Sequence, residues 1–240
     1  MKTAAHYDVL GSVDGMAVLV LLLLLIRGPD RKFRALAVYA AWEFLGPLGL
    51  TIFDLRRTPT QNVLYNHLYW MDEIAADLLL FSVIILLARR ATPEGPLRRK
   101  IDRLLAAAAG VVLTLPFLIP HPAFDPWPTN KWFNTMAEIL IFGAGIMNLA
   151  LWDALIASRH RDPQLLRVRA GLGIRVAGMA MAYGVRHSVP PGTARFLPNI
   201  LLLLVQLGGS LIIGGSLILC WAVWPMAKRS HKPDAVAVSP

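Results

Sequence analysis

The sequence predicts an all-α fold, a polytopic bundle of seven transmembrane helices with the N-terminus outside and the C-terminus in the cytoplasm. Three observations predict this fold. Of the 240 residues, 56% are hydrophobic and only 16% are charged, whereas soluble domains average roughly 45–50% apolar and about 25% charged residues. The apolar residues gather into seven long stretches, and the basic residues cluster between alternate stretches.

The seven stretches extend along almost the whole chain, which we treat as one membrane domain, residues 1–240. A spanning helix needs about 20 mostly apolar residues. The expected spans lie near 9–26, 33–53, 63–88, 101–119, 132–157, 170–185 and 197–224, and residues 225–240 form a short cytoplasmic tail. The sixth span is the weakest, because it is short, rich in glycine and interrupted by Arg175.

The basic residues set the orientation. The connections 27–34, 89–103 and 159–175 and the tail hold 18 of the Lys and Arg residues, and the opposite side holds six. Cytoplasmic loops carry the excess of positive charge, so the larger set is assigned to the cytoplasm. This alternation needs all seven spans, because losing the sixth would move the basic tail outside.

The first span is expected to be retained rather than cleaved as a signal peptide. Its N-terminal part carries Asp8 and Asp14 beside Lys2, its positive cluster follows the apolar run, and it shows no small-residue cleavage site. The single cysteine, Cys220, lies inside an apolar run, so the sequence offers neither an intrachain disulfide nor a cysteine-based metal site.

Acidic residues inside the expected spans are the main functional pointers, since buried carboxylates usually face protein or water. Glu43 lies near the middle of the second span, four residues before Pro47, which should kink the helix there. Asp72, Glu73 and Asp77 lie in the third span. Glu73 and Asp77 share one helix face, and Asp77 should reach the depth of Glu43, so these two carboxylates could meet.

Other polar groups join from the remaining helices: Asp14, Glu138, Gln206, Arg186 and His187. Three interpretations stay open. In the first, the groups are structural, with Glu43 protonated and Asp72 or Glu73 paired with Arg186. In the second, they line an outer polar cavity that binds a cation, a proton or a small polar ligand. In the third, His67 and outer carboxylates bind a metal, although no known metal-ligand spacing supports it.

The seventh span carries a surface of small residues, which either packs closely within the bundle or forms a dimer face. These residues are Gly208, Gly209, Ser210, Gly214, Gly215 and Ser216.

Several functions lack the residues they need. Every lysine lies at a span end or in a loop, so no span offers the Schiff-base lysine of a retinal protein. No HExxH, GxGxxG or P-loop motif occurs, so we expect no enzyme activity and predict no cofactor. The formal net charge of +9 comes from basic clusters beside apolar runs. That placement predicts contact with anionic lipid rather than nucleic acid.

The order of these features resembles a group of uncharacterised seven-span bacterial membrane proteins, seen especially in acidobacteria. The resemblance rests on Arg31-Lys32-Phe33-Arg34, on the pattern Tyr69, Trp70 and Glu73, on the apolar run 78–87 and on the basic connection that follows. The Tyr-Glu pair frequent in that group is replaced here by Leu86-Leu87-Ala88-Arg89. The resemblance implies a multi-pass protein of the bacterial inner membrane.

Three functions remain as hypotheses. The first is a receptor- or sensor-like bundle that binds a ligand in its outer half and signals through a partner on the basic loops. The second is a proton- or cation-coupled transporter that uses Glu43 and Asp77. The third is a structural or assembly subunit, in which the small-residue surface of the seventh span contacts a partner or a second copy.

Overall fold

The computed structural model describes residues 2–28, 31–56, 58–91, 96–118, 130–157, 163–188 and 198–229. These residues form seven α-helices and two short 3-10 helices, and no strand occurs among them, which confirms the all-α prediction. The α-helices are α1 (Lys2–Arg27), α2 (Arg34–Arg56), α3 (Asn62–Ala91), α4 (Pro96–Leu118), α5 (Asn130–Ala157), α6 (Pro163–Ser188) and α7 (Pro198–Arg229). The 3-10 helices are η1 (Arg31–Phe33) and η2 (Pro59–Gln61). The tail beyond Arg229 lies outside the described residues.

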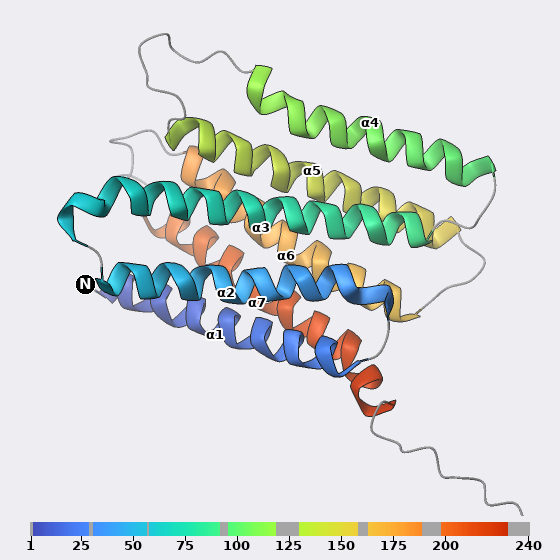
Figure 1. The fold of residues 1–240 in the computed structure, drawn as a ribbon, viewed down its shortest axis with the longest axis horizontal. Coiled ribbons are helices and arrows are strands. Elements are labelled where there is room, and N and C mark those ends of the chain that lie inside the picture. The colour runs from blue at the N-terminus through green and yellow to red at the C-terminus, as the bar shows by residue number, and fades with distance from the viewer. Residues whose placement is uncertain are drawn as a thin grey trace, which may run out of the picture.

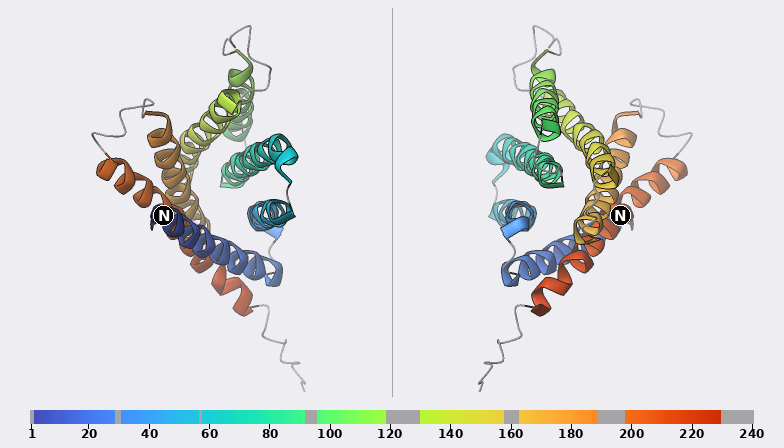
Figure 2. Two further views of the ribbon diagram at one scale, coloured as in Figure 1. Left: turned by 90° about the vertical axis from the view of Figure 1, so that its left-hand side faces the viewer. Right: turned by 90° about the vertical axis from the view of Figure 1, so that its right-hand side faces the viewer.

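Six of the helices close a ring and the seventh lies outside it. Going round the ring, α1 packs on α2, α2 on α3, α3 on α5, α5 on α6, α6 on α7, and α7 returns to α1. Helix α4 packs mainly on the outer side of α5 (Figure 2). Consecutive helices run antiparallel (Figure 1), so α1, α3 and α5 end, and α2, α4 and α6 begin, at the same end of the bundle.

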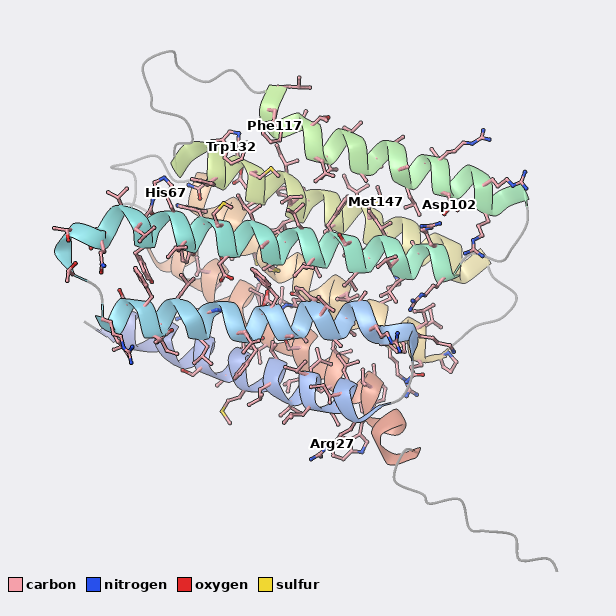
Figure 3. All side chains as sticks on the ribbon, in the orientation of Figure 1. Arg27, His67, Asp102, Phe117, Trp132 and Met147 are labelled. Atoms are coloured by element: carbon pink, nitrogen blue, oxygen red, sulfur yellow. The ribbon has the colours of Figure 1, made fainter. Side chains whose placement is uncertain are left out.

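That end is basic. Arg27 closes α1, Arg34 opens α2, and Arg89 and Arg90 close α3. Asp102 near the start of α4 accepts a hydrogen bond from Arg89 at 2.8 Å. Figure 3 shows Arg27 and Asp102 toward this basic end, while His67, Phe117 and Trp132 lie toward the opposite end. We call these the basic end and the aromatic end.

Two segments of the described chain, Arg34–Arg56 and Leu203–Trp224, are long and apolar enough to cross a membrane by length and composition. Helix α3 fails that test for a local reason, because Asp72, Glu73 and Asp77 lie near its middle and two arginines lie at its end. Crossing of the membrane by all seven helices therefore stays a prediction.

The interior has two apolar clusters. The larger one occupies the basic half and the middle of the ring, with Tyr39, Leu80, Ile84, Leu172 and Leu219 among its most buried members. The smaller one joins α3 to α5 near the aromatic end, and comprises Trp70, Ile74, Trp132, Phe133, Met136 and Leu140. In it the rings of Trp70 and Phe133 stack with their centroids 6.0 Å apart.

Helices α6 and α7 cross with their backbones almost in contact. A Cβ atom added at Gly178 would lie 2.6 Å from the carbonyl oxygen of Gly208, and one added at Gly215 would lie 2.7 Å from the carbonyl oxygen of Gly171. Small residues permit this approach, as between membrane helices. Gly208 and Gly215 of the small-residue surface thus pack within the bundle, whereas a Cβ at Gly214 would meet open space.

We expect Gly215→Ala to destabilise the protein and Gly214→Ala to be neutral or stabilising. Both changes improve helix propensity by about 1 kcal/mol, but only the first forces backbone atoms of α6 away from α7. Overpacking of this kind costs about 1–3 kcal/mol. Thermal unfolding of the two variants in the same lipid measures the difference, and equal melting temperatures would contradict the α6–α7 packing.

Candidate functional site

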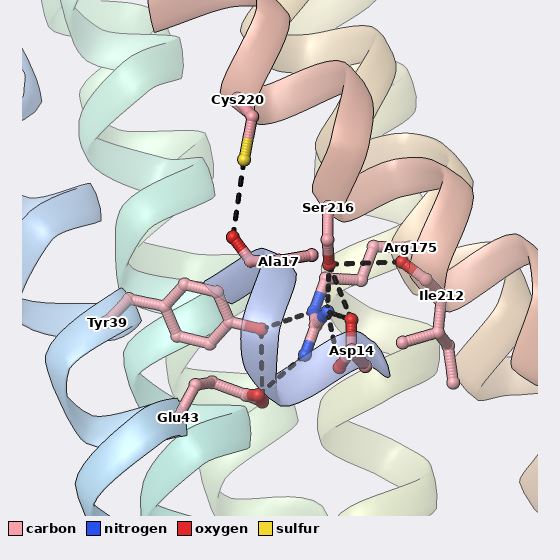
Figure 4. A network of polar contacts seen from close by, with 8 residues as sticks. All are labelled: Asp14, Ala17, Tyr39, Glu43, Arg175, Ile212, Ser216 and Cys220. Carbon is pink, nitrogen blue, oxygen red and sulfur yellow. Dashed lines mark hydrogen bonds and ion pairs between the residues drawn. The ribbon is translucent and has the colours of Figure 1, made fainter. Parts of the chain in front are cut away.

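Arg175 lies at the middle of α6 and points into the interior of the ring, where only 3% of its side chain is exposed. Each of its three guanidinium nitrogens donates a hydrogen bond to another helix (Figure 4). We call this residue and its partners Asp14, Tyr39, Glu43 and Ser216 the Arg175 network. The network joins α1, α2, α6 and α7 at a single point.

On one side, Arg175 binds α1 and α7. Its Nη1 atom lies 3.0 and 3.1 Å from the two carboxylate oxygens of Asp14, and 2.5 Å from the Ser216 hydroxyl oxygen. The Ser216 hydroxyl is in turn 2.8 Å from Asp14 Oδ1 and 3.1 Å from the carbonyl oxygen of Ile212. One turn along α7, the Cys220 thiol donates to the carbonyl oxygen of Ala17 at 3.3 Å, which holds α1 against α7.

On the other side, Arg175 binds α2. Its Nη2 atom lies 2.6 Å from Glu43 Oε2, and its Nε atom donates to the Tyr39 hydroxyl oxygen at 2.8 Å. Tyr39 then donates to the other Glu43 oxygen at 3.2 Å, one turn along the same helix. Since α2 and α6 are not neighbours in the ring, these bonds connect them across its interior.

The charges of the network do not balance. One guanidinium contacts two carboxylates, and these are themselves 19% and 14% exposed. Buried ion pairs are stable only when hydrogen bonds satisfy their remaining polar atoms, and the Tyr39 and Ser216 hydroxyls supply such bonds here. Negative charge therefore exceeds positive charge at the centre of the bundle when both carboxyls are ionised.

A third carboxyl lies on α3 beyond the network. Asp77 is 1% exposed, and neither of its carboxyl oxygens has a hydrogen-bond partner. It interacts electrostatically with Glu73 on its own helix, with Glu43 on α2 and with Arg175 on α6. The sequence predicts that Glu43 and Asp77 could meet. The structure brings them into electrostatic range, but the hydrogen bonds of Glu43 go to Arg175 and Tyr39.

Asp72 lies toward the aromatic end, against α2. A Cβ atom added at Gly46 would collide with the carboxyl group of Asp72, so this glycine makes room for that group. The indole nitrogen of Trp42 donates to the backbone carbonyl oxygen of Asp72 at 3.4 Å. These contacts hold α2 and α3 beside each other toward the aromatic end.

The other predicted residues lie apart from the network. Glu73 is half-buried one turn outward from Asp77, and Glu138 is half-buried on α5. His67 directs Nδ1 at the carbonyl oxygen of Val63, 2.8 Å away, and its ring meets that of Phe133 edge-on. Among the residues that the structure describes, no group of three His, Cys, Asp or Glu side chains could hold a metal ion. The side chain of Arg186 lies outside the described residues, as do those of His6, His121 and His187.

Arg175 is the residue that sequence reasoning misplaced. The charge count assigns it to the cytoplasmic side, whereas the structure buries it at the middle of a 26-residue helix. The expected sixth span, 170–185, begins about two turns inside that helix. Arg175 lies about as far from the ends of its helix as Asp14 and Glu43 lie from the ends of theirs. This shared mid-helix position is the sequence feature that predicts a contact between them.

Comparison with protein-family models, curated proteins and solved structures finds no match to this chain.

Proposed function

We propose that this chain is a seven-span protein of the bacterial inner membrane that acts as a proton- or cation-coupled transporter. Glu43 and Asp77 would be the groups that exchange the coupling ion. The observation that carries the proposal is the charged interior: a buried arginine binds two carboxylates, and a third buried carboxyl lies beside them without a hydrogen-bond partner. Charged groups inside a membrane bundle typically mark ion or proton paths.

The outer surface supports the membrane part of the proposal. Large apolar side chains face outward at helical spacing on four helices of the ring and on α4, where a soluble protein would carry charge. They include Met16 and Leu23 on α1, Val38 and Leu45 on α2, Leu104 and Val111 on α4, Ile146 and Leu149 on α5, and Leu203 and Leu217 on α7. Large apolar side chains therefore cover the outside of the bundle at mid-height, where the Arg175 network and Asp77 lie inside it.

Outward-facing hydroxyl groups support the same conclusion. Thr51, Ser82, Thr114 and Ser210 are all exposed, and each donates a hydrogen bond to the carbonyl oxygen four residues earlier in its own helix, at 2.7 to 2.9 Å. In water such hydroxyls have ample solvent partners. In hydrocarbon the helix backbone is the partner within reach, so this pattern suits a lipid-facing surface.

The orientation follows from the basic end, which we place in the cytoplasm by the positive-inside rule. The N-terminus is then outside and α7 ends in the cytoplasm. We expect the basic end to attract anionic lipid. Reporter fusions at the C-terminus check the orientation: a fused green fluorescent protein should fluoresce, and a fused alkaline phosphatase should be inactive.

Transport fits the geometry better than a receptor that binds a ligand in the outer half. Aromatic packing joins the outer parts of α3 and α5, and the contact between Asp72 and Gly46 joins those of α2 and α3. The charged groups instead converge at mid-height, equally far from both ends. The glycine face of α7 is used against α6, which weakens the case for an assembly subunit built on that face.

Proton or cation flux tests the proposal. The purified protein is reconstituted into vesicles that hold a pH-sensitive dye, and a potassium diffusion potential, negative inside, is imposed with valinomycin. Internal pH is followed with Na⁺, Li⁺ or choline outside. We expect the wild type to change internal pH faster than empty vesicles in at least one condition. Glu43→Gln and Asp77→Asn should reduce that rate by more than about tenfold, as loss of a proton-transfer group does.

Asp102→Asn is the matched control, because it removes a carboxyl of the basic end that takes no part in the mid-height site. It should keep the wild-type rate. Circular dichroism and size-exclusion profiles confirm that the variants fold. A wild type indistinguishable from empty vesicles in every condition, or an Asp77→Asn variant with full flux, would refute the transport function.

A further inference from the structure

Asp77 differs from the other carboxyls of the interior in having nothing bound to it. Asp14 and Glu43 each accept hydrogen bonds from Arg175 and from a hydroxyl group. Asp77 is more deeply buried than either of them, and both of its oxygens lack a partner. An ionised carboxylate in such surroundings is costly, so this position is suited to a carboxyl that binds and releases a cation.

The surroundings of Asp77 can be followed helix by helix. Between α3 and α5, the Trp70–Phe133 stack lies on the aromatic-end side of Asp77, and the approach of Phe81 to Gly143 lies on its basic-end side. The charged groups that act on it are Glu73 on α3, Glu43 on α2 and Arg175 on α6. Two of these three are carboxyls, so they favour binding of a positive charge.

The ligand set decides which cation fits. Hard metal cations need about six oxygen ligands at short range. Neither oxygen of the Asp77 carboxyl has a hydrogen-bond partner, and the described residues contain no group of three His, Cys, Asp or Glu side chains that could hold a metal ion. A proton needs only one carboxylate oxygen, and it removes the charge that the site cannot otherwise compensate.

We infer that Asp77 is a proton-binding site, and that the proton is the coupling ion of the proposed transporter, with Glu43, bound to Arg175 and Tyr39, as the second group on its path. The role of the proton as the coupling ion rests on the proposed function, whereas proton binding at Asp77 can be tested by itself. The step is a proton transfer alone: the carboxylate takes a proton to become the neutral acid and later returns it. Glu73, one turn outward on the same helix face, lies between Asp77 and the aromatic end.

Infrared difference spectroscopy on the purified protein in lipid tests the site. Films are perfused with buffers of falling pH, and the carbonyl stretch of a protonated carboxylic acid is recorded. We expect one acid band from a solvent-shielded group that shifts to lower frequency in heavy water. Asp77→Asn should abolish this band, Asp77→Glu should keep it at a changed frequency, and Asp102→Asn should leave it unchanged.

Two results would overturn the inference. The first is an acid band that survives unchanged in Asp77→Asn, which would mean that another carboxyl takes the proton. The second is loss of the band when Na⁺ is added at constant pH, which would mean that a metal cation occupies the site. If Asp77→Asn does not fold, Asp77→Glu still decides, because an Asp77 band must move when its side chain is lengthened.

The infrared and flux experiments fail independently. An Asp77 acid band without flux in vesicles would support the proton site and refute transport. Flux without an Asp77 acid band would support transport and refute the assignment of the proton to Asp77.

Discussion

Arg175→Met is expected to destabilise the protein by about 3–5 kcal/mol, the usual cost of removing one partner from a buried ion pair. Methionine keeps an unbranched side chain that reaches about as far as the arginine Nε atom, and it removes the charged guanidinium group. The two carboxylates of Asp14 and Glu43 then lie close together without a cation. The bonds that join α2 to α6 and α6 to α1 are lost at the same time.

Unfolding in lipid can be followed through the single cysteine. Cys220 is half-buried against Ala17, so a thiol-reactive dye reports separation of α7 from α1. Arg89→Met is the matched control: it breaks an ion pair whose side chains are 48% and 32% exposed, and exposed pairs contribute about 0–1 kcal/mol. The triple variant Asp14→Asn, Glu43→Gln, Arg175→Met should recover stability. An Arg175→Met variant as stable as Arg89→Met would contradict the network.

Asp77→Ala is expected to do the opposite, raising stability by about 1–3 kcal/mol, the penalty for a buried polar group without a partner. The change removes both unpartnered oxygens and adds a good helix former at the middle of α3. Flux in vesicles should be lost at the same time, because the proton-binding carboxyl is gone. A gain in stability with a loss of activity is typical of a functional site.

Asp14→Ala is the control for Asp77→Ala, since it makes the same substitution at a carboxyl that does have partners. It should lower the melting temperature, because Arg175 loses a counter-ion. The sign of the two effects is therefore the readout. If both variants are destabilised alike, Asp77 has a structural partner and the proton-binding assignment loses its basis.

The sequence predicts the helices well, because apolar runs and the proline and basic residues at their ends are local features. It also identifies Glu43 and Asp77 as interior groups, since carboxyls at mid-span depth face protein or water. The close packing of Gly208 and Gly215 is one of two alternatives that the small-residue pattern left open. Each of these inferences needs only the position of a residue along one helix.

The partners of these groups could not be predicted, because depth in a helix does not say which faces meet. Sequential neighbours suggested that Glu43 meets Asp77, while the bond that forms runs from α2 across the ring to Arg175 on α6. The position of Arg175 is also hard to predict, because its helix mixes basic and apolar residues, and this composition favours placing Arg175 at the end of a basic loop. The place of α4 outside the ring is likewise a tertiary feature, set by its packing on α5.

The central claim is that all seven helices form a bundle embedded in lipid around a charged interior, and spin-label accessibility tests it most directly. After Cys220→Ser, single cysteines are placed at the outward residues Met16, Val111 and Ile146, on helices α1, α4 and α5. These helices lie outside the two segments that qualify as spans by composition. Each position is labelled with a nitroxide in vesicles. We predict that collisions with oxygen are frequent and collisions with a water-soluble nickel chelate are rare at all three positions. Ready access of the nickel chelate to any of them would contradict a seven-span bundle.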